Sequence, residues 1–269
     1  MADSKVTSNT GLNIGGCAIR AAKSRGVVIA NSAFDSNTCE GSGAVVDYVA
    51  STCSGGGASL MVESDMPPFG LGNATDCAWA PKHLVHISDT TFQRDMASVA
   101  SCGGSLMLAS AWLELHRSSI SGTGKTTAKV AGAIASTGSA VVLQDSRIVD
   151  HRASDRAGAL YQRHGRLWAS NTTFANASVV RRDGGGCLYV IDVTEVKISG
   201  CAFENCMAPY GGGGLFCQVM YEQFDSPPPI SIHASRFSRN RVWRDGGAMN
   251  ILQMDLTVTD TVFEHNEVG

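Results

Sequence analysis

Charged and aromatic residues are scarce in this chain of 269 residues. Charged side chains make up 17% of it and aromatic side chains 7%, whereas about a quarter of an ordinary globular domain is charged. The formal net charge of -3 lacks the basic excess expected of a nucleic-acid-binding protein. No apolar run reaches the length of about 18 residues that a membrane-spanning helix needs. The hydrophobic content of 43% excludes a disordered chain, so we expect a folded protein.

A secretory signal is also lacking, because the polar residues Ala2–Lys5 follow Met1 with no apolar stretch behind them. Yet the chain contains nine cysteines, more than a reduced cytosolic protein usually carries. We therefore expect disulfides and an extracellular or cell-surface location. Since nine is odd, at least one thiol is free or pairs with a segment outside this chain.

Glycine, in contrast, is abundant, and the 30 glycines belong in part to a repeat. Large apolar residues, here called anchors, recur every 26–34 residues after a first spacing of 58, and a small residue stands two positions before each of them. The anchors are Phe34, Phe92, Ile120, Ile148, Phe174, Phe203, Phe237 and Phe263. Aliphatic residues stand five and seven positions before each anchor, and a glycine followed by a small and then an apolar residue lies between successive anchors.

The alternation at positions minus seven and minus five is the period of a strand with one buried face. A bend or bulge before the small residue would return that residue and the anchor to the interior. A unit of about 27 residues with short strands cannot close its own core, so successive units must stack. Stacking creates ladders in which Ser and Thr hydroxyls can be satisfied, and glycine fits where the backbone corners sharply or takes a positive φ. The repeat therefore predicts an all-β fold, a parallel β-helix (solenoid) of about eight coils of 26–29 residues.

The glycine step and the anchor tetrapeptide F-x-x-N resemble a known family of repeats. The full tetrapeptide occurs at Phe34–Asn37, Phe237–Asn240 and Phe263–Asn266. It is similar to the polymorphic outer-membrane-protein repeat of right-handed parallel β-helices in the pectin-lyase-like superfamily, and the resemblance extends from about residue 12 onward. The resemblance implies a right-handed helix and one domain over residues 1–269. Such repeats serve adhesins, surface proteins and carbohydrate-active enzymes alike, so function must be argued from the site.

Three stretches exceed the repeat and are predicted to be loops that leave the coil wall. They are residues 38–54, 63–83 and 217–229. Loops on a rigid scaffold often hold binding residues, although neutral insertions explain them equally well. The chain also ends at Gly269 within a repeat, and we therefore expect it to be a fragment of a longer protein.

The cysteines of the repeat region allow several disulfides. Cys39, Cys53 and Cys77 lie in or beside the first two loops, which favours a disulfide between these loops. Farther along, Cys201 and Cys206 flank one anchor. Their alternative partners lie about one coil away on either side, and these are Cys187 and Cys217. Connectivity does not follow from spacing alone.

An enzyme of the pectin-lyase-like type would need paired carboxylates for hydrolysis, or a carboxylate cluster that binds calcium and a basic residue for elimination. The best cluster for this alternative consists of Asp145, Asp150 and Arg152 with His151 between them. Aspartates at turns also bond nearby backbone amides without any catalytic role, and we favour that interpretation. The chain has no CxxC, HExxH or GxSxG motif, so we predict no metal and no cofactor, with calcium only under the lyase alternative.

A basic edge offers a different function. Arg147, Arg163 and Arg166 have the forked guanidinium that binds acidic polysaccharides. Trp168 is predicted to project outward at position minus six, where it could stack on a sugar ring. The same residues also fit a solvated turn edge with one exposed tryptophan, and this is the interpretation that we favour for them.

Three glycosylation sequons begin at Asn73, Asn171 and Asn176, all in predicted turns or loops, as glycosylation requires. Taken together, the sequence favours a non-catalytic, secreted or surface β-helix scaffold for adhesion, with a glycan or a cell-surface protein as partner. The alternative is a polysaccharide lyase or glycoside hydrolase. The sequence indicates no oligomeric state.

Overall fold

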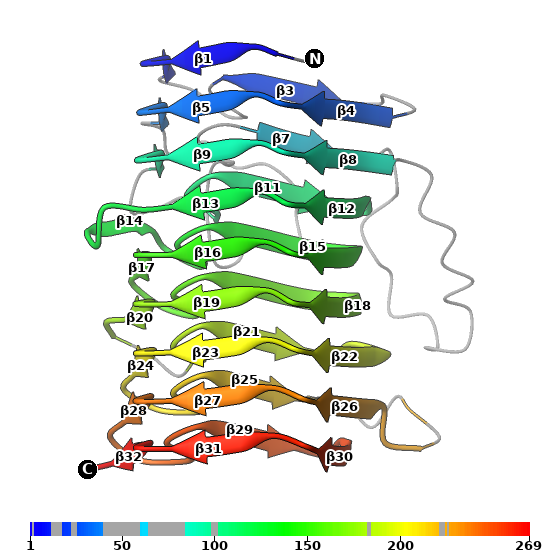
Figure 1. Ribbon diagram of the computed structural model, residues 1–269, viewed down its shortest axis with the longest axis vertical. Helices are drawn as coiled ribbons and strands as arrows, with labels where there is room; N and C mark the ends of the chain where they lie inside the picture. The colour runs from blue at the N-terminus through cyan, green and yellow to red at the C-terminus, as the bar shows by residue number, and fades with distance from the viewer. Residues whose placement is uncertain are drawn as a thin grey trace.

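The chain forms a β-solenoid of about seven turns, as the computed structural model of the protein shows in Figure 1. The structure describes residues 1, 3–11, 18–22, 26–39, 60–63, 84–97, 102–181, 184–220, 224 and 226–269. Every regular element within these ranges is a β-strand, and the same residues contain no helix long and apolar enough to cross a membrane. The predicted all-β parallel β-helix is therefore confirmed, with close to the predicted number of coils.

Parallel pairing between successive coils builds one long sheet and three narrower ones. The long sheet contains two strands, or one bent strand, from each coil. Its strands are β3 (Ile19–Ala22), β4 (Gly26–Ala30), β7 (Leu60–Glu63), β8 (Leu84–Ser88), β11 (Leu106–Ala109), β12 (Trp112–His116), β15 (Ile134–Gln144), β18 (Leu160–Ser170), β21 (Leu188–Ile191), β22 (Glu195–Ser199), β25 (Leu215–Gln218), β26 (Pro229–His233), β29 (Met249–Leu252) and β30 (Asp255–Thr259).

The second sheet holds the anchors, and we call it the anchor sheet. Its strands are β1 (Lys5–Thr7), β5 (Ala33–Asp35), β9 (Thr91–Gln93), β13 (Ser119–Ser121), β16 (Arg147–Val149), β19 (Thr173–Ala175), β23 (Ala202–Glu204), β27 (Arg236–Ser238) and β31 (Val262–Glu264). One further short strand completes each coil, and these strands belong to two separate sheets. The two sheets contain β2 (Thr10–Gly11), β6 (Thr38–Cys39) and β10 (Met96–Ala97), and then β14 (Thr126–Ala128), β17 (Arg152–Ala153), β20 (Ser178–Val179), β24 (Met207–Ala208), β28 (Arg241–Val242) and β32 (Glu267–Val268).

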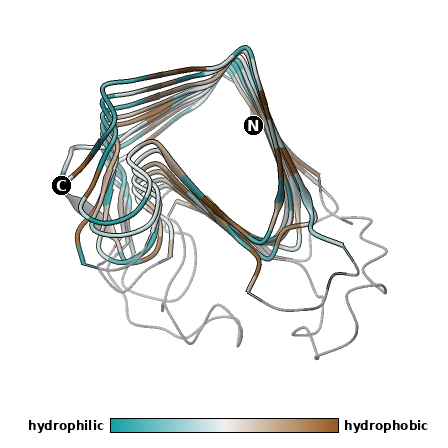
Figure 2. Cartoon of the chain, turned by 90° about the horizontal axis from the view of Figure 1, so that it is seen from below, coloured by the Kyte–Doolittle hydropathy of each residue, from teal (hydrophilic) through white to brown (hydrophobic). Residues whose placement is uncertain are grey.

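The helix is right-handed. In Figure 1 the front strands run leftward, the rear strands run rightward, and the chain descends from the N-terminus to the C-terminus. Figure 2 looks along the axis and shows the coils superimposed, so that each strand lies over its counterpart in the next coil. This arrangement is the stacking that a short repeat needs to bury its apolar face.

The anchors form a continuous interior column. Phe34 pairs in register with Phe92, and every later anchor pairs with the anchor of the next coil. Seven of the eight are fully buried, whereas Phe263 in the last coil is 43% exposed. Val6 occupies the same register one coil earlier, an anchor that the spacing did not reveal. Burial of each large apolar side chain contributes about 1.5–3 kcal/mol.

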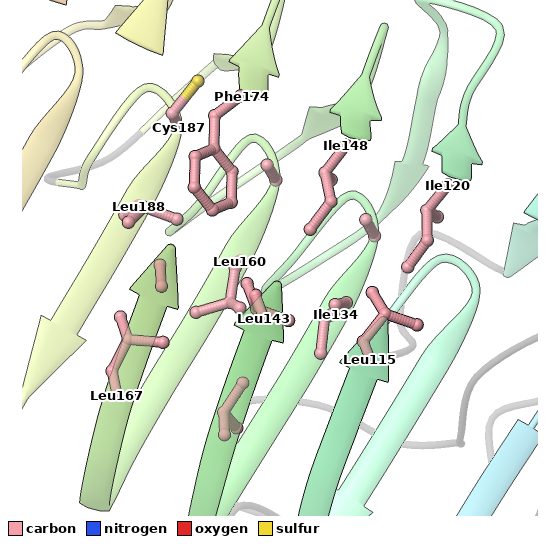
Figure 3. Packing of buried hydrophobic residues seen from close by; sticks show 14 of the residues in the cluster. Leu115, Ile120, Ile134, Leu143, Ile148, Leu160, Leu167, Phe174, Cys187 and Leu188 are labelled. Atoms are coloured by element: carbon pink, nitrogen blue, oxygen red, sulfur yellow. The ribbon is translucent and has the colours of Figure 1, made fainter. Parts of the chain in front are cut away.

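Aliphatic residues of the long sheet face the anchors. Leu115 and Leu143, five positions before their anchors, point into the same interior as Ile120 and Ile148 (Figure 3). The residues between them, such as Glu114, are only partly buried. The predicted period of two with one buried face is confirmed.

The chain turns a sharp corner between these strands and the anchor sheet, at the predicted bend. The residue three positions before each anchor takes a positive φ, and these corner residues are Asn31, Asp89, Arg117, Asp145, Asn171, Gly200, Ala234 and Asp260. Only one of them is glycine. Asparagine and aspartate tolerate this conformation better than other non-glycine residues, because their short side chains form hydrogen bonds with the nearby backbone. Arg117 and Ala234 adopt it as well. Glycine therefore has a different role from the corner role predicted for it.

Close approach between coils explains the glycine step. A Cβ added to Gly158 would collide with the carbonyl oxygen of Gly186 in the next coil, and one added to Gly186 would collide with that of Gly213. None of these three glycines has a positive φ. The glycine column therefore lets backbones touch where a side chain would hold them apart.

The predicted hydroxyl ladder is confirmed. The backbone N–H of Thr90 donates to the hydroxyl of Ser118 at 3.1 Å, and the N–H of Ser118 donates to the hydroxyl of Ser146 at 3.2 Å. Each hydroxyl in turn donates to the carbonyl two residues before it, at 2.7 Å in all three cases. Buried polar groups are thus satisfied coil by coil, as their desolvation requires.

The asparagine of the F-x-x-N tetrapeptide also faces inward. Asn240 is fully buried, donates from Nδ2 to the carbonyl of Phe203 at 3.0 Å, and accepts from the N–H of Cys206 at 3.0 Å. His151 replaces asparagine at this position and places Nε2 3.2 Å from the carbonyl of Ile120, which is the anchor of the preceding coil. His151 therefore takes over the bond that asparagine makes elsewhere.

A second, smaller core lies on the outer side of the long sheet, where the glycine-rich return segments cover it. Tyr161, Tyr189 and Phe216 are stacked there, with ring centroids 5.8 and 4.9 Å apart, and all three are buried. Arg156 donates to the hydroxyl of Tyr189 at 3.1 Å. The repeat pattern did not predict burial on both faces of these strands.

One disulfide joins Cys187 to Cys206, with Cα atoms 5.4 Å apart. Cys102 is also disulfide-bonded, while Cys201 and Cys217 are free and buried. Cys53, Cys77 and most of the three predicted loops lie outside the described residues. The predictions about the loops therefore stay predictions.

Candidate functional site

β12 passes into β13 at the corner between the long sheet and the anchor sheet (Figure 1). A groove follows this corner. Its volume is about 630 Å³. Its lining comes from equivalent positions of four successive coils: Asp89, Thr90, Thr91, Arg117, Ser118, Ser119, Asp145, Ser146, Arg147, Asn171 and Thr173. Because neighbouring strands lie about 4.8 Å apart, the groove presents a new set of polar side chains at that interval.

The charged side chains that line the groove differ in whether they form ion pairs and hydrogen bonds. Arg117 donates two hydrogen bonds to Asp89, at 2.8 and 2.7 Å, and this bonding lowers the pKa of the Asp89 carboxyl and raises that of the guanidinium. Asp145 accepts a bond from Asn171 Nδ2 at 3.0 Å. Arg147 has no ion-pair partner among the residues that the structure describes, and its side chain is exposed.

The three arginines of the predicted basic edge lie in three different places. Arg147 lies in the groove, while Arg166 is exposed on the outer face of the long sheet. Arg163 precedes the bend within β18, and its Nε is 3.8 Å from a carboxylate oxygen of the buried Asp192. The edge is therefore not one continuous patch.

Trp168 projects from the outer face of β18, as predicted, but its indole is already engaged. Nε1 donates to Glu195 at 2.7 Å, and the ammonium of Lys197 lies 5.5 Å from the ring centroid. Trp112 packs edge-on against it at 6.2 Å. The two tryptophans lie on the same outer face of the long sheet as Arg166.

Trp112 was not predicted to belong to this surface. It stands eight positions before its anchor, whereas Trp168 stands six positions before its own, so the two share no ladder. The sequence does indicate that both tryptophans occupy outward positions of their strands. Their contact was not predictable, because the side chains reach across an intervening coil and sequence spacing does not determine that reach.

The four residues of the enzyme alternative do not converge. Asp145 and Asp150 lie beyond the two ends of β16, each with a positive φ. Asp150 accepts a bond from Asn176 Nδ2 at 2.9 Å. His151 is inside the solenoid, and burial lowers its pKa to about 4, so it is neutral at physiological pH. Arg152 follows in β17, half-buried.

The sequons fall at corners where the structure describes them. Asn171 and Asn176 are exposed, but their amides are bonded to Asp145 and Asp150. Asn73 lies outside the described residues. A glycan attached to Asn171 would occupy one end of the groove, since this residue is part of its lining.

The sequence did not indicate a further cluster, which consists of three candidate metal ligands. His86, Glu114 and His116 place their ligand atoms within 4.8 Å of one another on the outer face of β8 and β12. Two of these residues are in register on neighbouring strands, His86 opposite Glu114. Since no local motif joins residues of different coils, only the coil register reveals the cluster.

Comparisons with known proteins assign no identity. No protein-family model matches the chain, and no match was found among curated proteins or solved structures. The fold class rests on the geometry above, and function rests on the surface residues.

Proposed function

We propose that this β-helix is a non-catalytic scaffold that binds a glycan along the groove. The observation that carries the proposal is the run of polar side chains from four coils with Arg147 unpaired among them. The charged residues in the lining are two aspartates and two arginines, so the groove suits a polar chain with isolated carboxylates better than a dense polyanion.

Each coil would contact about one sugar ring. Thr91, Ser119 and Thr173 present hydroxyls from in-register strands of the anchor sheet, and Arg147 offers a guanidinium fork for a carboxylate. Trp112 and Trp168 supply apolar ring surface on the outer face of the long sheet. Carbohydrate sites typically combine these two kinds of contact, since a sugar has both hydroxyl edges and an apolar face.

The enzyme alternative receives less support from the same geometry. A lyase or hydrolase needs an acid and a base that reach one bond, whereas His151 is buried and Asp150 lies at the other end of β16 from the groove. Asp145 is the one residue of that set in the groove lining.

An extracellular or cell-surface location belongs to the proposal. A disulfide at Cys187–Cys206 is typical of an oxidising compartment. The glycine step and the inward asparagine support the resemblance to polymorphic outer-membrane-protein repeats, and adhesion is a function that this resemblance favours.

The test is binding to a panel of acidic and neutral polysaccharides, with and without calcium, followed by co-sedimentation and calorimetry. We expect a carboxylated polysaccharide to bind and Arg147→Ala to weaken the binding at least about fivefold. The matched control is Arg236→Ala, because Arg236 occupies the same position three coils later and is paired with Glu264 at 2.7 Å outside the groove. Equal losses in both variants, or no binding to any polymer, would contradict the proposal. Unsaturated products or new reducing ends would establish the enzyme alternative instead.

A further inference from the structure

The outer face of β8 and β12 carries three side chains with the chemistry of a transition-metal site. Nδ1 of His86 lies 3.1 Å from Oε2 of Glu114, and Nε2 of His116 lies 4.0 Å from the same oxygen. Imidazole nitrogen and carboxylate oxygen are the ligands with which proteins hold zinc. In a tetrahedral site with bonds of about 2.0–2.1 Å, ligand atoms are about 3.3 Å apart, close to the first distance and somewhat below the second.

We propose that His86, Glu114 and His116 bind a divalent transition-metal ion of the zinc class. Three protein ligands leave the fourth tetrahedral position open. The side chains are 34%, 31% and 21% exposed in that order, so an ion can enter from solvent and the fourth position faces outward. The three ligand atoms already lie within 4.8 Å of one another.

The backbone holds the ligands in place. His86 and Glu114 are directly opposite on parallel strands, and His116 follows two residues after Glu114 on the same outward face. Sites on strands are more precise than sites on loops, because the ladder of hydrogen bonds fixes the Cα positions. The coil register therefore presets most of the geometry before any ion arrives.

Among the residues that the structure describes, no cation stands in register with the carboxylate or the two histidines in the neighbouring coils. The residues in register with His86 and Glu114 on the far sides are Val28 and Val142, and those flanking His116 are Ser88 and Gln144. Arg117, which follows His116 in the chain, donates hydrogen bonds to Asp89. Glu114 is thus free to turn its charge toward an ion held between the two imidazoles.

The site is separate from the proposed glycan groove. It lies on the long sheet, one strand position before the corner residues that line the groove, and it needs neither Arg147 nor the tryptophans. A failure of the glycan-binding proposal would leave the metal-site proposal standing, and a failure of the metal-site proposal would leave the glycan-binding proposal standing.

The experiment titrates the untagged protein with Co²⁺ and Zn²⁺, followed by the visible absorption of cobalt and by calorimetry. We expect one ion per chain with the absorption of a tetrahedral nitrogen and oxygen site. Each of His86→Ala, His116→Ala and Glu114→Gln should weaken binding at least about tenfold, since each removes one of three ligands. Zn²⁺ should also raise the Tm of the natural protein and not that of His86→Ala.

His233→Ala is the matched control. His233 stands in the same outward column as His116, beside Asp260 at 3.4 Å, but without a second histidine in ligand range among the described residues. Its loss should leave the affinity unchanged. The two free thiols in the described part of the chain are poor competitors, because burial raises the pKa of Cys201 to about 11 and that of Cys217 even more.

Three results would overturn the proposal. They are the absence of saturable binding, affinity in His86→Ala equal to that of the natural protein, and an equal loss in His233→Ala. Because the three ligands face outward, far-ultraviolet circular dichroism should show that each variant keeps its fold, which separates loss of a ligand from loss of structure.

Discussion

The two faces of a single strand behave differently along the solenoid. In β12, Leu115 points inward and is stacked between Ile87 and Leu143, residues of the same chemical type. The neighbouring outward residue, Glu114, lies between a histidine and a valine. The inward columns of strand residues keep one chemistry from coil to coil, whereas the outward columns change it.

The contrast has a simple cause. An inward side chain touches its equivalents in the coils on both sides, so a misfit there disturbs three coils at once. An outward side chain is surrounded largely by solvent and is free to vary. The inward columns therefore specify the fold. Functional residues are expected among the outward residues that differ from their equivalents in the other coils.

The largest expected effect comes from a charge on the inward face. Ile198→Asp would bury a carboxylate without a partner among Ala169, Ile232 and the anchors. We expect the free energy of unfolding to fall by more than about 4 kcal/mol, enough to unfold most domains. Urea denaturation followed by circular dichroism measures it.

Ser199→Asp is the control for that substitution, since Ser199 is the next residue and is exposed. It should change stability by less than about 0.5 kcal/mol. Similar denaturation midpoints for the two variants would mean that the inward and outward faces are not distinct.

The next effect concerns His151, which stands at the inward position that asparagine occupies in three other coils, at Asn37, Asn240 and Asn266. Its folded-state pKa of about 4 lies below its ordinary value of 6.5, so the folded state disfavours the proton. The contribution of His151 to the free energy of unfolding is complete above pH 6.5. It declines as the pH falls toward 4, because His151 is protonated in the unfolded chain but stays neutral in the folded chain. The loss should reach roughly 3 kcal/mol near pH 4.

His151→Asn isolates this contribution. Asparagine fits the same column, donates the same bond to the preceding anchor carbonyl, and does not titrate. Stability curves between pH 7 and pH 4 should be flatter for the variant than for the natural protein. Parallel curves would show that His151 is not the responsible group.

The smallest of the three effects tests the glycine column. Gly158→Ala would place a methyl group against backbone atoms of Gly186, Ser178 and Ala177, and we expect a loss of about 1–3 kcal/mol from overpacking. Gly124→Ala is a control of a different kind, since nothing lies within 4 Å of its added Cβ, although its φ of 71° is strained. Thermal unfolding compares them, and an equal or larger loss in Gly124→Ala would contradict the close-approach explanation.

Much of the fold was predictable because inward columns repeat. Eight anchors, the small residue before each and the aliphatic pair before that were enough to specify stacked coils and their register. The role of glycine was less accessible, since a repeated glycine signals either a positive φ or a close approach, and only the structure distinguishes them. Val6 was missed because the sequence offers no earlier anchor from which to count its spacing.

The candidate sites were harder to predict, for a reason that the same contrast explains. Arg147, Arg163 and Arg166 are neighbours in sequence but lie on different parts of the coil. His86 and Glu114 are far apart in sequence and lie opposite each other. Proximity on a solenoid surface runs between coils, so it depends on register and side-chain reach rather than on sequence spacing.

The disulfide has a mechanical consequence. Cys187 precedes β21 and Cys206 follows β23, so the bond closes most of one coil into a covalent ring. When the chain is pulled from its two ends, the 19-residue span between the two cysteines is withheld from the extended length. A reducing agent would release this span and lengthen the fully stretched chain by about 60 Å.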